Sequence, residues 1–579
     1  MSTTSINAIR HSLAHLLAIS VLEFDSKAKL GIGPATETGF FYDIALSKEK
    51  PLSESDFKTL EKTMRKLIHK KLDFIREELS ERDARELFKS QPYKLELIEG
   101  IVARGETISV YRTADFVDLC EGPHVENTGE IPVDAFAIVR VAGAYWKSDE
   151  SRDQLTRITG IAFESKAALE KYLWQQEEAK KRDHRKLGKE LKLFTLSDLV
   201  GSGLPLLQPN GMVIRQEIEN YLWSLHRMKG YSRVWTPHIA KETLYKTSGH
   251  AEKFGDELFR VQGKEEKFFL KPMNCPHHMQ IFADNDWSYR DMPVRYFEPA
   301  TVYRDEKSGQ LAGLTRVRSI TQDDGHLFCR ASQIGDEVST IVSIIKEFYT
   351  AFNMINGYWV RLSVRGKDGK YLGSDEVWET AEKALEDSAK ENALPYTRVE
   401  GEAAFYGPKL DFIFKDALDR EWQLATIQCD FNLPERFNLS FANERGEKER
   451  PVVIHRAISG SLERFMGIMI EHCSGAFPLW LSPIQIALLP IGESHEAYAK
   501  KIANTFLEEN FRVGILSDES LGKRIRETKV KKIPYIFVVG DKEVETQTVS
   551  VESRDTGKLG SLPIEETLNR LQLERTEKR

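Results

Sequence analysis

Apolar and polar positions divide the chain into three blocks, with one strongly charged segment between the first and the second. Residues 164–192 are rich in helix-forming and charged residues and contain no proline. This pattern predicts one exposed helix, of the kind that connects two domains. Residues 1–163, which precede it, mix helical stretches with strand-like runs such as DAFAIVRVAGAYW at 134–146.

The second and third blocks both alternate strands with helices. Residues 193–484 contain the strand-like runs 294–304 and 411–431 between longer helical stretches. In the third block, three apolar runs alternate with the helical stretches 496–509 and 521–532. This alternation predicts a small α/β domain with a largely parallel sheet at the C-terminal end of the chain.

Composition limits the classes of protein that fit. The 579 residues are 41% hydrophobic and 30% charged, which is typical of a soluble protein with several domains. No apolar run is long enough to span a membrane, and the N-terminus is a poor signal peptide. Five scattered cysteines are typical of a reducing, cytoplasmic location. A net charge of -7 disfavours nucleic-acid binding by overall charge but is compatible with a local basic surface.

Two short stretches of the second block suggest chemistry. In 303–328, a strand ends at Arg304, and a turn with glycine leads to a second strand that carries Arg316. Arginines on paired strands bind phosphate well, because each guanidinium pairs with two oxygens, although a solvated hairpin has the same pattern. In 453–465, a strand leads through a glycine into a helix that carries Arg464.

Together with WTPHIAKETLYKTSGH, where a proline follows a strand, these stretches resemble motifs 1, 2 and 3 of class II aminoacyl-tRNA synthetases. The stretches KPMNCP, RVRSITQDDGHLF, FYGPKLDF and IHRAISGSLERF resemble threonyl-tRNA synthetases in particular, and the resemblance covers nearly the whole chain. It implies an α+β multidomain protein whose catalytic domain is an antiparallel sheet flanked by helices. It also implies a homodimer that uses ATP with Mg²⁺ to join threonine to tRNA(Thr).

The resemblance also implies a division of the chain into parts. These are an editing domain at 1–163, the linker helix at 164–192, the class II catalytic domain at 193–484 and an α/β anticodon-binding domain at 485–579. Many family members begin with a further ubiquitin-like domain. Only ten residues precede His11 here, so we expect that domain to be missing.

Cys275 stands apart from the other cysteines, and the ordinary interpretation of such a residue is a buried free thiol. By the resemblance, Cys275, His326 and His455 hold one zinc ion per subunit. One thiolate and two imidazoles suit zinc, and three protein ligands leave a coordination position for a substrate. The neighbouring His277 and His278 are local alternatives, and family members usually have glycine at the position of His277.

A zinc ion would allow the site to distinguish threonine from valine. Valine has nearly the shape of threonine, and an apolar pocket separates such isosteres poorly. The resemblance implies a five-coordinate zinc that binds the amino group and β-hydroxyl of threonine, with Asp324 accepting from the hydroxyl. Valine lacks that hydroxyl and would be excluded.

Further residues are assigned by the resemblance to the catalytic site. Arg304, Arg464 and His250 are the catalytic candidates: Arg304 matches a contact to the α-phosphate, Arg464 matches a residue that helps to hold ATP, and His250 matches a histidine near the 2′-hydroxyl of the terminal tRNA adenosine. A histidine there can help to move a proton. The other matches to residues that bind threonine or ATP are Met273, Arg316, Gln322, Tyr406, Lys409, Gln423, Gln428 and Ser461.

The N-terminal block carries a second Cys/His set, formed by HSLAH and CEGPH and consisting of His11, His15, Cys120 and His124. Composition and spacing alone favour a second zinc. The related domain of alanyl-tRNA synthetases binds zinc with similar residues, whereas the resemblance to threonyl-tRNA synthetases implies a metal-free pocket that places a water on an ester carbonyl. Other residues matching that pocket are Tyr42, Lys94 and Asp118, of which Lys94 can help to activate water or to stabilise an oxyanion.

The two predicted sites complement each other chemically. Serine keeps the hydroxyl of threonine and lacks only a methyl group, a difference worth about 1–3 kcal/mol. A zinc filter therefore admits some serine, and hydrolysis of seryl-tRNA(Thr) is needed for accuracy.

In the C-terminal block, Arg526 and Arg554 match anticodon-contacting positions, and 523–532 provides a local basic surface. Asp518 stands where relatives have asparagine, and an ionised acid cannot donate a hydrogen bond there. Two alternatives remain open from the sequence: another class II specificity, such as prolyl, or a regulatory paralogue that binds RNA without catalysis.

Overall fold

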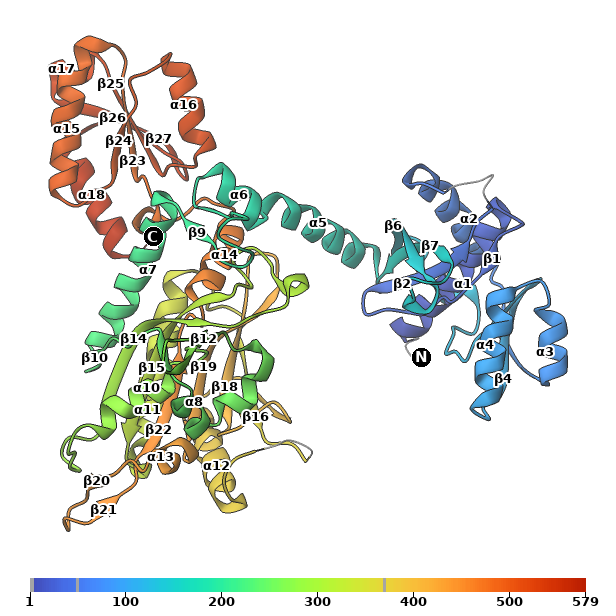
Figure 1. Ribbon diagram of the computed structural model, residues 1–579. Coiled ribbons are helices and arrows are strands. Elements are labelled where there is room, and N and C mark those ends of the chain that lie inside the picture. Colours follow the sequence, from blue (N-terminus) through green and yellow to red (C-terminus); the bar gives the residue numbers. More distant parts are fainter. Residues whose placement is uncertain (1–4, 48–51, 368–370, 579) are drawn as a thin grey trace. The chain divides into compact units, whose positions relative to one another are not determined.

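The computed structural model describes residues 5–47, 52–367 and 371–578 (Figure 1). The chain divides into two compact units, Met1–Glu177 and Glu178–Arg579. Within the described residues, no helix is both long and apolar enough to cross a membrane.

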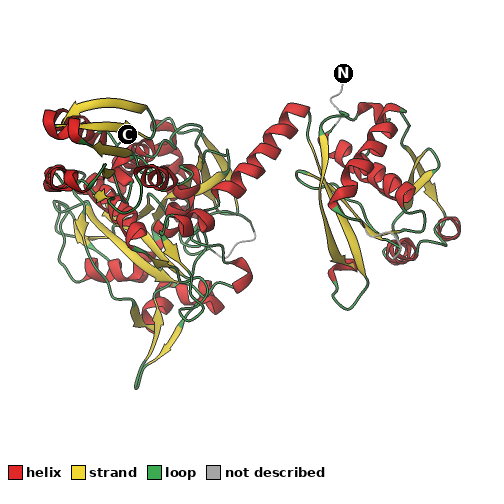
Figure 2. Ribbon diagram, turned by 90° about the horizontal axis from the view of Figure 1, so that it is seen from above, coloured by secondary structure: helices red, strands yellow, loops and turns green. Residues whose placement is uncertain are grey.

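The first unit contains a four-stranded antiparallel sheet covered by two helices (Figure 2). The strand order is β1 (Lys29–Leu30), β2 (Gly39–Ala45), β7 (Gln154–Ala162) and β6 (Phe136–Tyr145), and the helices are α1 (Ile6–Phe24) and α2 (Phe57–His69). The strand predicted at 134–146 is β6. Apolar residues of both helices and of β2 form one buried core, which includes Leu13, Leu17, Phe40 and Leu60.

A smaller sheet in the same unit holds the second half of the N-terminal Cys/His set. It consists of β3 (Ile75–Leu79), β4 (Ile108–Thr113) and β5 (Phe116–Leu119), with α3 (Glu81–Leu87) and α4 (Pro92–Ala103) beside it. Its small core contains Ala84, Ile98 and Val110. Because β5 ends at Leu119, Cys120 lies directly beyond the end of a strand.

The charged segment 164–192 forms two helices rather than the single exposed helix predicted from its composition. These are α5 (Lys166–Arg182) and α6 (His184–Glu190). The break falls at Asp183, whose carboxylate accepts a hydrogen bond from the backbone N–H of Arg185 at 2.8 Å and caps α6. His184 and Leu187 are buried, so α6 is part of the core and only α5 has the predicted polar character.

The second unit contains an eight-stranded sheet, most of it antiparallel. Its order is β10 (Ser232–Arg233), β14 (Val294–Tyr303), β15 (Ser319–Cys329), β22 (Val452–Ala457), β19 (Glu421–Asp430), β18 (Lys409–Lys415), β16 (Trp359–Val364) and β17 (Tyr396–Glu400). The flanking helices are α7 (Pro209–Arg227), α11 (Ile334–Ala351), α12 (Asp375–Glu391) and α14 (Leu462–His472). The apolar residues of α7, α11 and α14 join those of the sheet in one buried core.

Shorter elements surround the opposite side of this sheet. They are β11 (Ile239–Lys241), β12 (Arg260–Gln262), β13 (Lys267–Leu270), α8 (Glu242–Ser248), α9 (His250–Phe254), α10 (Cys275–Ala283), α13 (Asn432–Arg436), β20 (Phe441–Ala442) and β21 (Lys448–Glu449); β8 (Phe194–Thr195) and β9 (Leu206–Leu207) precede α7. The predicted antiparallel pair with Arg304 at its turn is β14 and β15. Arg316, however, lies in the loop before β15 and not on the strand, because the strand begins only at Ser319.

The C-terminal sheet is mixed. β23 (Ile486–Pro490) pairs in parallel with β24 (Val513–Ile515) and β25 (Tyr535–Val539), whereas β26 (Thr548–Ser553) and β27 (Gly557–Pro563) are antiparallel. The sheet is therefore parallel in one half only, not largely parallel as predicted. α15 (Glu496–Glu508) and α18 (Ile564–Thr576) pack on one face and α16 (Leu521–Val530) packs on the other, while α17 (Asp541–Thr546) follows β25 (Figure 1).

Candidate functional site

The register of three central strands brings the predicted zinc ligands together. His326 on β15 stands opposite His455 on β22, and His455 stands opposite Gln428 on β19. Since side chains alternate between the two faces of a strand, Gln322 and Asp324 share the face of His326. The central strands therefore present two imidazoles, a carboxylate and two amides toward one side.

Cys275, the first residue of α10, completes the set. Donor atoms of Cys275, His326 and His455 lie within 4.8 Å of one another, and all three residues are buried. Burial raises the pKa of the Cys275 thiol well above its usual value. A cation at this place would offset that penalty, because it stabilises the thiolate.

Whether the two histidines fit a metal depends on what the other nitrogen of each imidazole contacts. Nε2 of His455 lies 2.9 Å from a carboxylate oxygen of Asp430, and Nδ1 of His326 lies 2.8 Å from Nδ1 of His278. His278 in turn lies 3.0 Å from Glu298 through Nε2. Each imidazole of the set thus keeps one nitrogen free while the other is hydrogen-bonded, which is the usual arrangement of zinc-binding histidines.

The structure separates the two local alternatives, His277 and His278. Both ring nitrogens of His278 have hydrogen-bond partners, so it orients His326 and is not available as a ligand. His277 is 8% exposed and its nitrogens have no hydrogen-bond partner, but it is not among the donors that cluster with Cys275. Burial lowers the pKa of His277 to about 4.

A cavity of about 570 Å³ lies in this region and is lined by eight of the predicted residues. Two of them end in buried polar atoms without a hydrogen-bond partner, Oε1 of Gln322 and Nε of Arg464. Oδ2 of Asp324, which is not among the lining residues, also has no hydrogen-bond partner. Such atoms are costly unless a ligand pairs with them. The eight residues are Met273, Arg304, Arg316, Gln322, Gln423, Gln428, Ser461 and Arg464.

A β-bulge accounts for Gln423 in this set. By strict alternation Gln423 would point away from Gln428 and Thr426. The register of β18 and β19 shifts between Asp411 and Ile413, which inserts an extra residue into β19. An extra residue reverses the alternation beyond it, so Gln423 lines the same cavity.

The arginines of the cavity are held by different means. The guanidinium of Arg304 donates to Sδ of Met273 at 3.0 Å and stacks over Phe254. Arg464 lies in the first turn of α14, where Ser461 caps the helix by accepting from its N–H, and its guanidinium stacks on Trp422. Burial lowers the pKa of both arginines, so an anion in the cavity would be strongly favoured.

Tyr406, Lys409 and His250 lie around the same site. The hydroxyl of Tyr406 donates to Gln428 at 2.5 Å, and Lys409 pairs with the carboxylate of Asp411 at 2.8 Å. Nε2 of His250 lies 3.5 Å from Sγ of Cys275, and burial lowers its pKa to about 3. His250 is therefore a neutral imidazole at neutral pH.

Two buried charges that support the site were missed by sequence reasoning. The carboxylate of Asp323 accepts from the backbone N–H groups of Ile458, Ser459 and Gly460, at 2.7, 3.0 and 3.1 Å. Arg456 donates to the carbonyl oxygen of Asp323 at 2.6 Å. The signal available in the sequence was a charged residue within a strand of the central sheet, since such residues are rarely buried without a partner.

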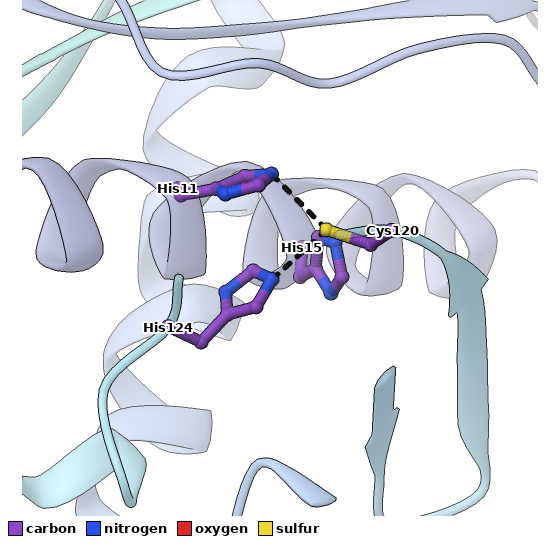
Figure 3. A group of neighbouring side chains, drawn as sticks. All are labelled: His11, His15, Cys120 and His124. Carbon is purple, nitrogen blue, oxygen red and sulfur yellow. Dashed lines mark hydrogen bonds between the residues drawn. The ribbon is translucent and has the colours of Figure 1, made fainter. Parts of the chain in front are cut away.

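In the first unit, His11 and His15 on α1 meet Cys120 and His124 (Figure 3). Sγ of Cys120 lies 3.3 Å from Nε2 of His11 and 3.2 Å from Nε2 of His124. Burial raises the pKa of Cys120 to about 12 and lowers the pKa of all three histidines. The set is therefore uncharged at neutral pH.

Lys94, Tyr42 and Asp118 form a buried polar network beside this set. Lys94 pairs with Asp118 and donates to the hydroxyl of Tyr42 at 3.1 Å, and Tyr42 donates to Asp118. A neighbouring cavity of about 500 Å³ is lined by His11, His15, Lys94, Asp118 and Cys120. Lys94 thus lies at the wall of this cavity, where Asp118 and Tyr42 hold its Nζ.

The two predicted anticodon residues differ in their surroundings. Arg526 on α16 is exposed. The guanidinium of Arg554 donates to the carbonyl oxygens of Phe477 and Lys532, both at 2.9 Å, and pairs with Asp555. Arg554 therefore connects the C-terminal sheet to the end of the catalytic region in the described structure.

Comparison with known proteins identifies the family. The threonine–tRNA ligase of Gloeobacter violaceus is 47% identical over 586 residues, which cover 99% of this chain and 93% of that protein. The threonine–tRNA ligase of Thermus thermophilus is 46% identical over 574 residues, which cover 96% and 86%. The chain belongs to the threonine–tRNA ligase family. The predicted family is thereby confirmed.

Profiles of three domain families match within the chain of this threonine–tRNA ligase family member. They are the tRNA synthetase class II core domain (G, H, P, S and T) at 259–473, the anticodon binding domain at 485–574, and the threonyl and alanyl tRNA synthetase second additional domain at 108–159. The predicted fold class, a class II core with an editing domain and an anticodon-binding domain, is confirmed.

Solved structures agree with this fold. The RNA binding domain of threonyl-tRNA synthetase from Cryptosporidium parvum has a TM-score of 0.65 and 35% identity, covering 68% of this chain and 98% of that one. A prolyl-tRNA synthetase of Giardia lamblia, at 19% identity and a TM-score of 0.53, covers 70% of this chain and 80% of that one and shares the fold alone.

We expect Asp323→Ala to destabilise the second unit by about 3 kcal/mol, because it removes the buried carboxylate 3.6 Å from the guanidinium of Arg456 and leaves three backbone N–H groups unsatisfied. Thermal unfolding followed by circular dichroism should show a midpoint lowered by several degrees. Asp323→Asn, which keeps one acceptor, should have a smaller effect. An unchanged midpoint in Asp323→Ala would show that the turn at Ile458–Gly460 is held by other contacts.

Proposed function

We propose that the chain activates threonine with ATP, transfers it to tRNA(Thr) and hydrolyses seryl-tRNA(Thr). The observation that carries the first part is the carboxylate oxygen Oδ2 of Asp324, which has no hydrogen-bond partner and lies on the same strand face as His326, near a cavity with Arg304 and Arg464. A polar acceptor near a Cys/His/His set suits an amino acid with a hydroxyl, and the arginines suit the phosphates of ATP.

Cys275, His326 and His455 would hold one zinc ion per subunit. Zinc bound there would supply a Lewis acid for the amino group and β-hydroxyl of threonine. Asp324 would accept from that hydroxyl, while Tyr406 fixes Gln428 beside the amino acid through its hydrogen bond. Valine would leave Asp324 unpaired in a buried site, and a site that requires a hydrogen bond rejects such an analogue strongly.

ATP, bound with Mg²⁺, would occupy the part of the cavity between Arg304 and Arg464. Nucleotidyl transfer depends on positioning and charge compensation more than on a protein nucleophile. Arg304 would pair with the α-phosphate, and Arg464 would be assisted by Arg316 and by Ser461 at the start of α14. Gln423, Met273 and Lys409 would complete the nucleotide site, with His250 assisting transfer to the tRNA end.

In the first unit, His11, His15, Cys120 and His124 would place a water on the ester of seryl-tRNA. Lys94, held by Tyr42 and Asp118, would stabilise the negative charge that develops on the carbonyl oxygen. The proposal keeps this pocket free of metal. We also propose Arg526 and Arg554 as anticodon contacts and the domain limits 1–163, 164–192, 193–484 and 485–579.

A homodimer is part of the proposal. Met228 and Trp235, close to the edge strand β10, are 79% and 74% exposed. Large apolar side chains at a sheet edge are typical of an interface with a second copy. The cytoplasmic location expected from the sequence stays a prediction.

ATP–pyrophosphate exchange with each amino acid tests the proposed function directly. Exchange that depends on threonine supports it. Exchange with proline would favour another class II specificity, and no exchange in folded protein would favour an RNA-binding paralogue.

We predict about one zinc per chain in purified protein, measured by atomic emission. Cys275→Ala should lose the metal together with threonine activation, because two imidazoles alone bind zinc weakly. Cys329→Ala, a change of another buried cysteine, should keep it. Two zincs per chain, one of them lost in Cys120→Ala, would contradict the metal-free interpretation of the first unit.

Arg464→Ala should lower the rate of threonine-dependent exchange at least a hundredfold, because developing charge loses a fixed partner in a buried site. Arg575→Ala, which removes an arginine from α18, is the matched control and should exchange normally. A near-normal rate in Arg464→Ala would mean that Arg464 does not face the nucleotide.

The double variant His11→Ala with His15→Ala should separate the two activities. Threonine activation should survive, because sites without shared partners behave nearly independently. Hydrolysis of seryl-tRNA(Thr) should fall sharply, since its water loses the groups that place it, and serine should accumulate on the tRNA. His69→Ala, an exposed histidine of α2, is the control. Undiminished hydrolysis in the double variant would exclude the first unit as the editing site.

A further inference from the structure

His184, the first residue of α6, is a buried imidazole with a carboxylate on one side and a loop on the other. Its Nδ1 lies 2.7 Å from Oε1 of Glu471, which also accepts from the backbone N–H of His184 at 3.0 Å. Its Nε2 accepts from the backbone N–H of Leu314 at 3.0 Å. A backbone N–H can only donate, so Nε2 carries no proton and Nδ1 carries it.

Asp183, His184 and Glu471 have possible metal-ligand atoms within 4.8 Å of one another. Their hydrogen bonds, however, favour a structural network over a metal site. Both ring nitrogens of His184 are occupied. The second oxygen of Glu471 accepts from the guanidinium of Arg420 at 2.6 Å. No ligand atom is left over, so the cluster serves to hold the backbone at Leu314.

The loop that carries Gly313 is in direct contact with His184. Gly313 has a φ of +53°, and a Cβ at this residue would lie 2.2 Å from Nε2 of His184. On the other side, a Cβ on Gly467 of α14 would lie 3.1 Å from Thr315 and 3.3 Å from the Cβ of Leu314. Leu314 itself is fully buried in the main core. The loop is thus clamped between α6 and α14.

The clamped loop forms a wall of the cavity proposed for ATP. Thr315, Arg316 and Val317, the three residues after Leu314, line it. Among the described residues, the hydrogen bonds of the Arg316 guanidinium go to Glu306 and Gln310, which precede it in the same connection between β14 and β15. Two backbone contacts outside this connection flank Arg316: Leu314 donates to His184 on one side, and Arg318 donates to the carbonyl oxygen of Gly203 at 2.8 Å on the other.

Glu471 links the contact between Leu314 and His184 to the other side of the nucleotide cavity. It lies on α14, seven residues after Arg464, which is about two helical turns. The helix that carries Arg464 therefore also orients the imidazole that holds the loop of Arg316. A shift of α14 would move both arginines together and keep their spacing.

We propose that His184 is a positioning residue for ATP: its unprotonated Nε2 holds the loop at Leu314 and so sets the place of Arg316 opposite Arg464. This proposal rests on the proposed function. Its ligand is the triphosphate of ATP, and the residue acts through the loop without touching the nucleotide.

Two substitutions of His184 separate its two hydrogen bonds. His184→Asn can still donate to Glu471 but does not reach Leu314, whereas His184→Gln can accept from Leu314. In threonine-dependent ATP–pyrophosphate exchange, His184→Asn should raise the KM for ATP about tenfold, because one buried hydrogen bond is lost. The KM for threonine should stay within twofold of the parent. His184→Gln should restore most of the affinity for ATP.

His495 supplies a matched control. Its Nδ1 accepts from the backbone N–H of Gly492 at 3.0 Å and its Nε2 lies 2.8 Å from Asp541, so it has the same two kinds of partner in the C-terminal domain. His495→Asn should leave the KM for ATP unchanged. A merely destabilising effect of losing such a histidine would appear in both variants.

Gly313→Ala and amide hydrogen exchange complete the test if His184→Asn folds poorly. Gly313→Ala places a methyl group against Nε2 and should raise the KM for ATP without altering His184. Amide hydrogen exchange in the peptide 308–318 should become faster in His184→Asn and in Gly313→Ala, but not in His495→Asn.

Several outcomes would overturn the proposal. They are an unchanged KM for ATP in folded His184→Asn, an equal rise in the KM for threonine and ATP, or an unchanged rate of amide hydrogen exchange in the peptide 308–318. If the parent protein shows no threonine-dependent exchange, the proposed function fails instead. The positioning proposal is then decided by calorimetric binding of ATP to the parent and the His184→Asn variant, where equal affinities would refute it.

Discussion

The pairing register of β15 with β22 is the constraint on which the catalytic region depends. It sets His326 against His455, and the pairing of β22 with β19 sets His455 against Gln428. A slip of one residue would turn every one of these side chains to the opposite face. The register is fixed from the other face, where Arg456 packs on the bare backbone of Gly325 so closely that a Cβ there would lie 2.3 Å from its guanidinium carbon.

The buried carboxylates of this region differ in whether every side-chain oxygen has a hydrogen-bond partner. Although burial alone would raise it, the hydrogen bond from His278 and the charge of Lys271 hold the pKa of Glu298 at about 2. Asp323 is likewise surrounded by donors. Burial raises the pKa of both Asp323 and the next residue, Asp324, but Oδ2 of Asp324 has no hydrogen-bond partner. Of these three carboxylates in the described structure, Asp324 is the one with a side-chain oxygen that has no hydrogen-bond partner, which agrees with its proposed role in binding threonine.

Long motifs allowed the family, the three catalytic motifs and the eight cavity residues to be predicted from the sequence, because the residues of each motif lie close together along the chain. The supporting residues could not be predicted. Asp323, His278 and His184 act on groups 135, 48 and 130 positions away in the chain, and such partners depend on the packing of separate elements. The bulge that turns Gln423 inward and the helix break at Asp183 depend on local backbone geometry that periodicity does not encode.

The two Cys/His sets of the chain differ in what surrounds them, and this difference supports one metal rather than two. In the set of Cys275, His455 is oriented by Asp430 and His326 by the His278–Glu298 pair, which is typical of zinc ligands. In the set of Cys120, Nδ1 of His15 has no hydrogen-bond partner, and the nearest carboxylate, Asp118, is already bound by Lys94 and Tyr42. Nδ1 of His124 lies 3.1 Å from the hydroxyl of Ser12 and not from a carboxylate. This weaker support favours the proposal of one metal per chain, and neutral imidazoles can still accept hydrogen bonds from a water in the proposed editing pocket.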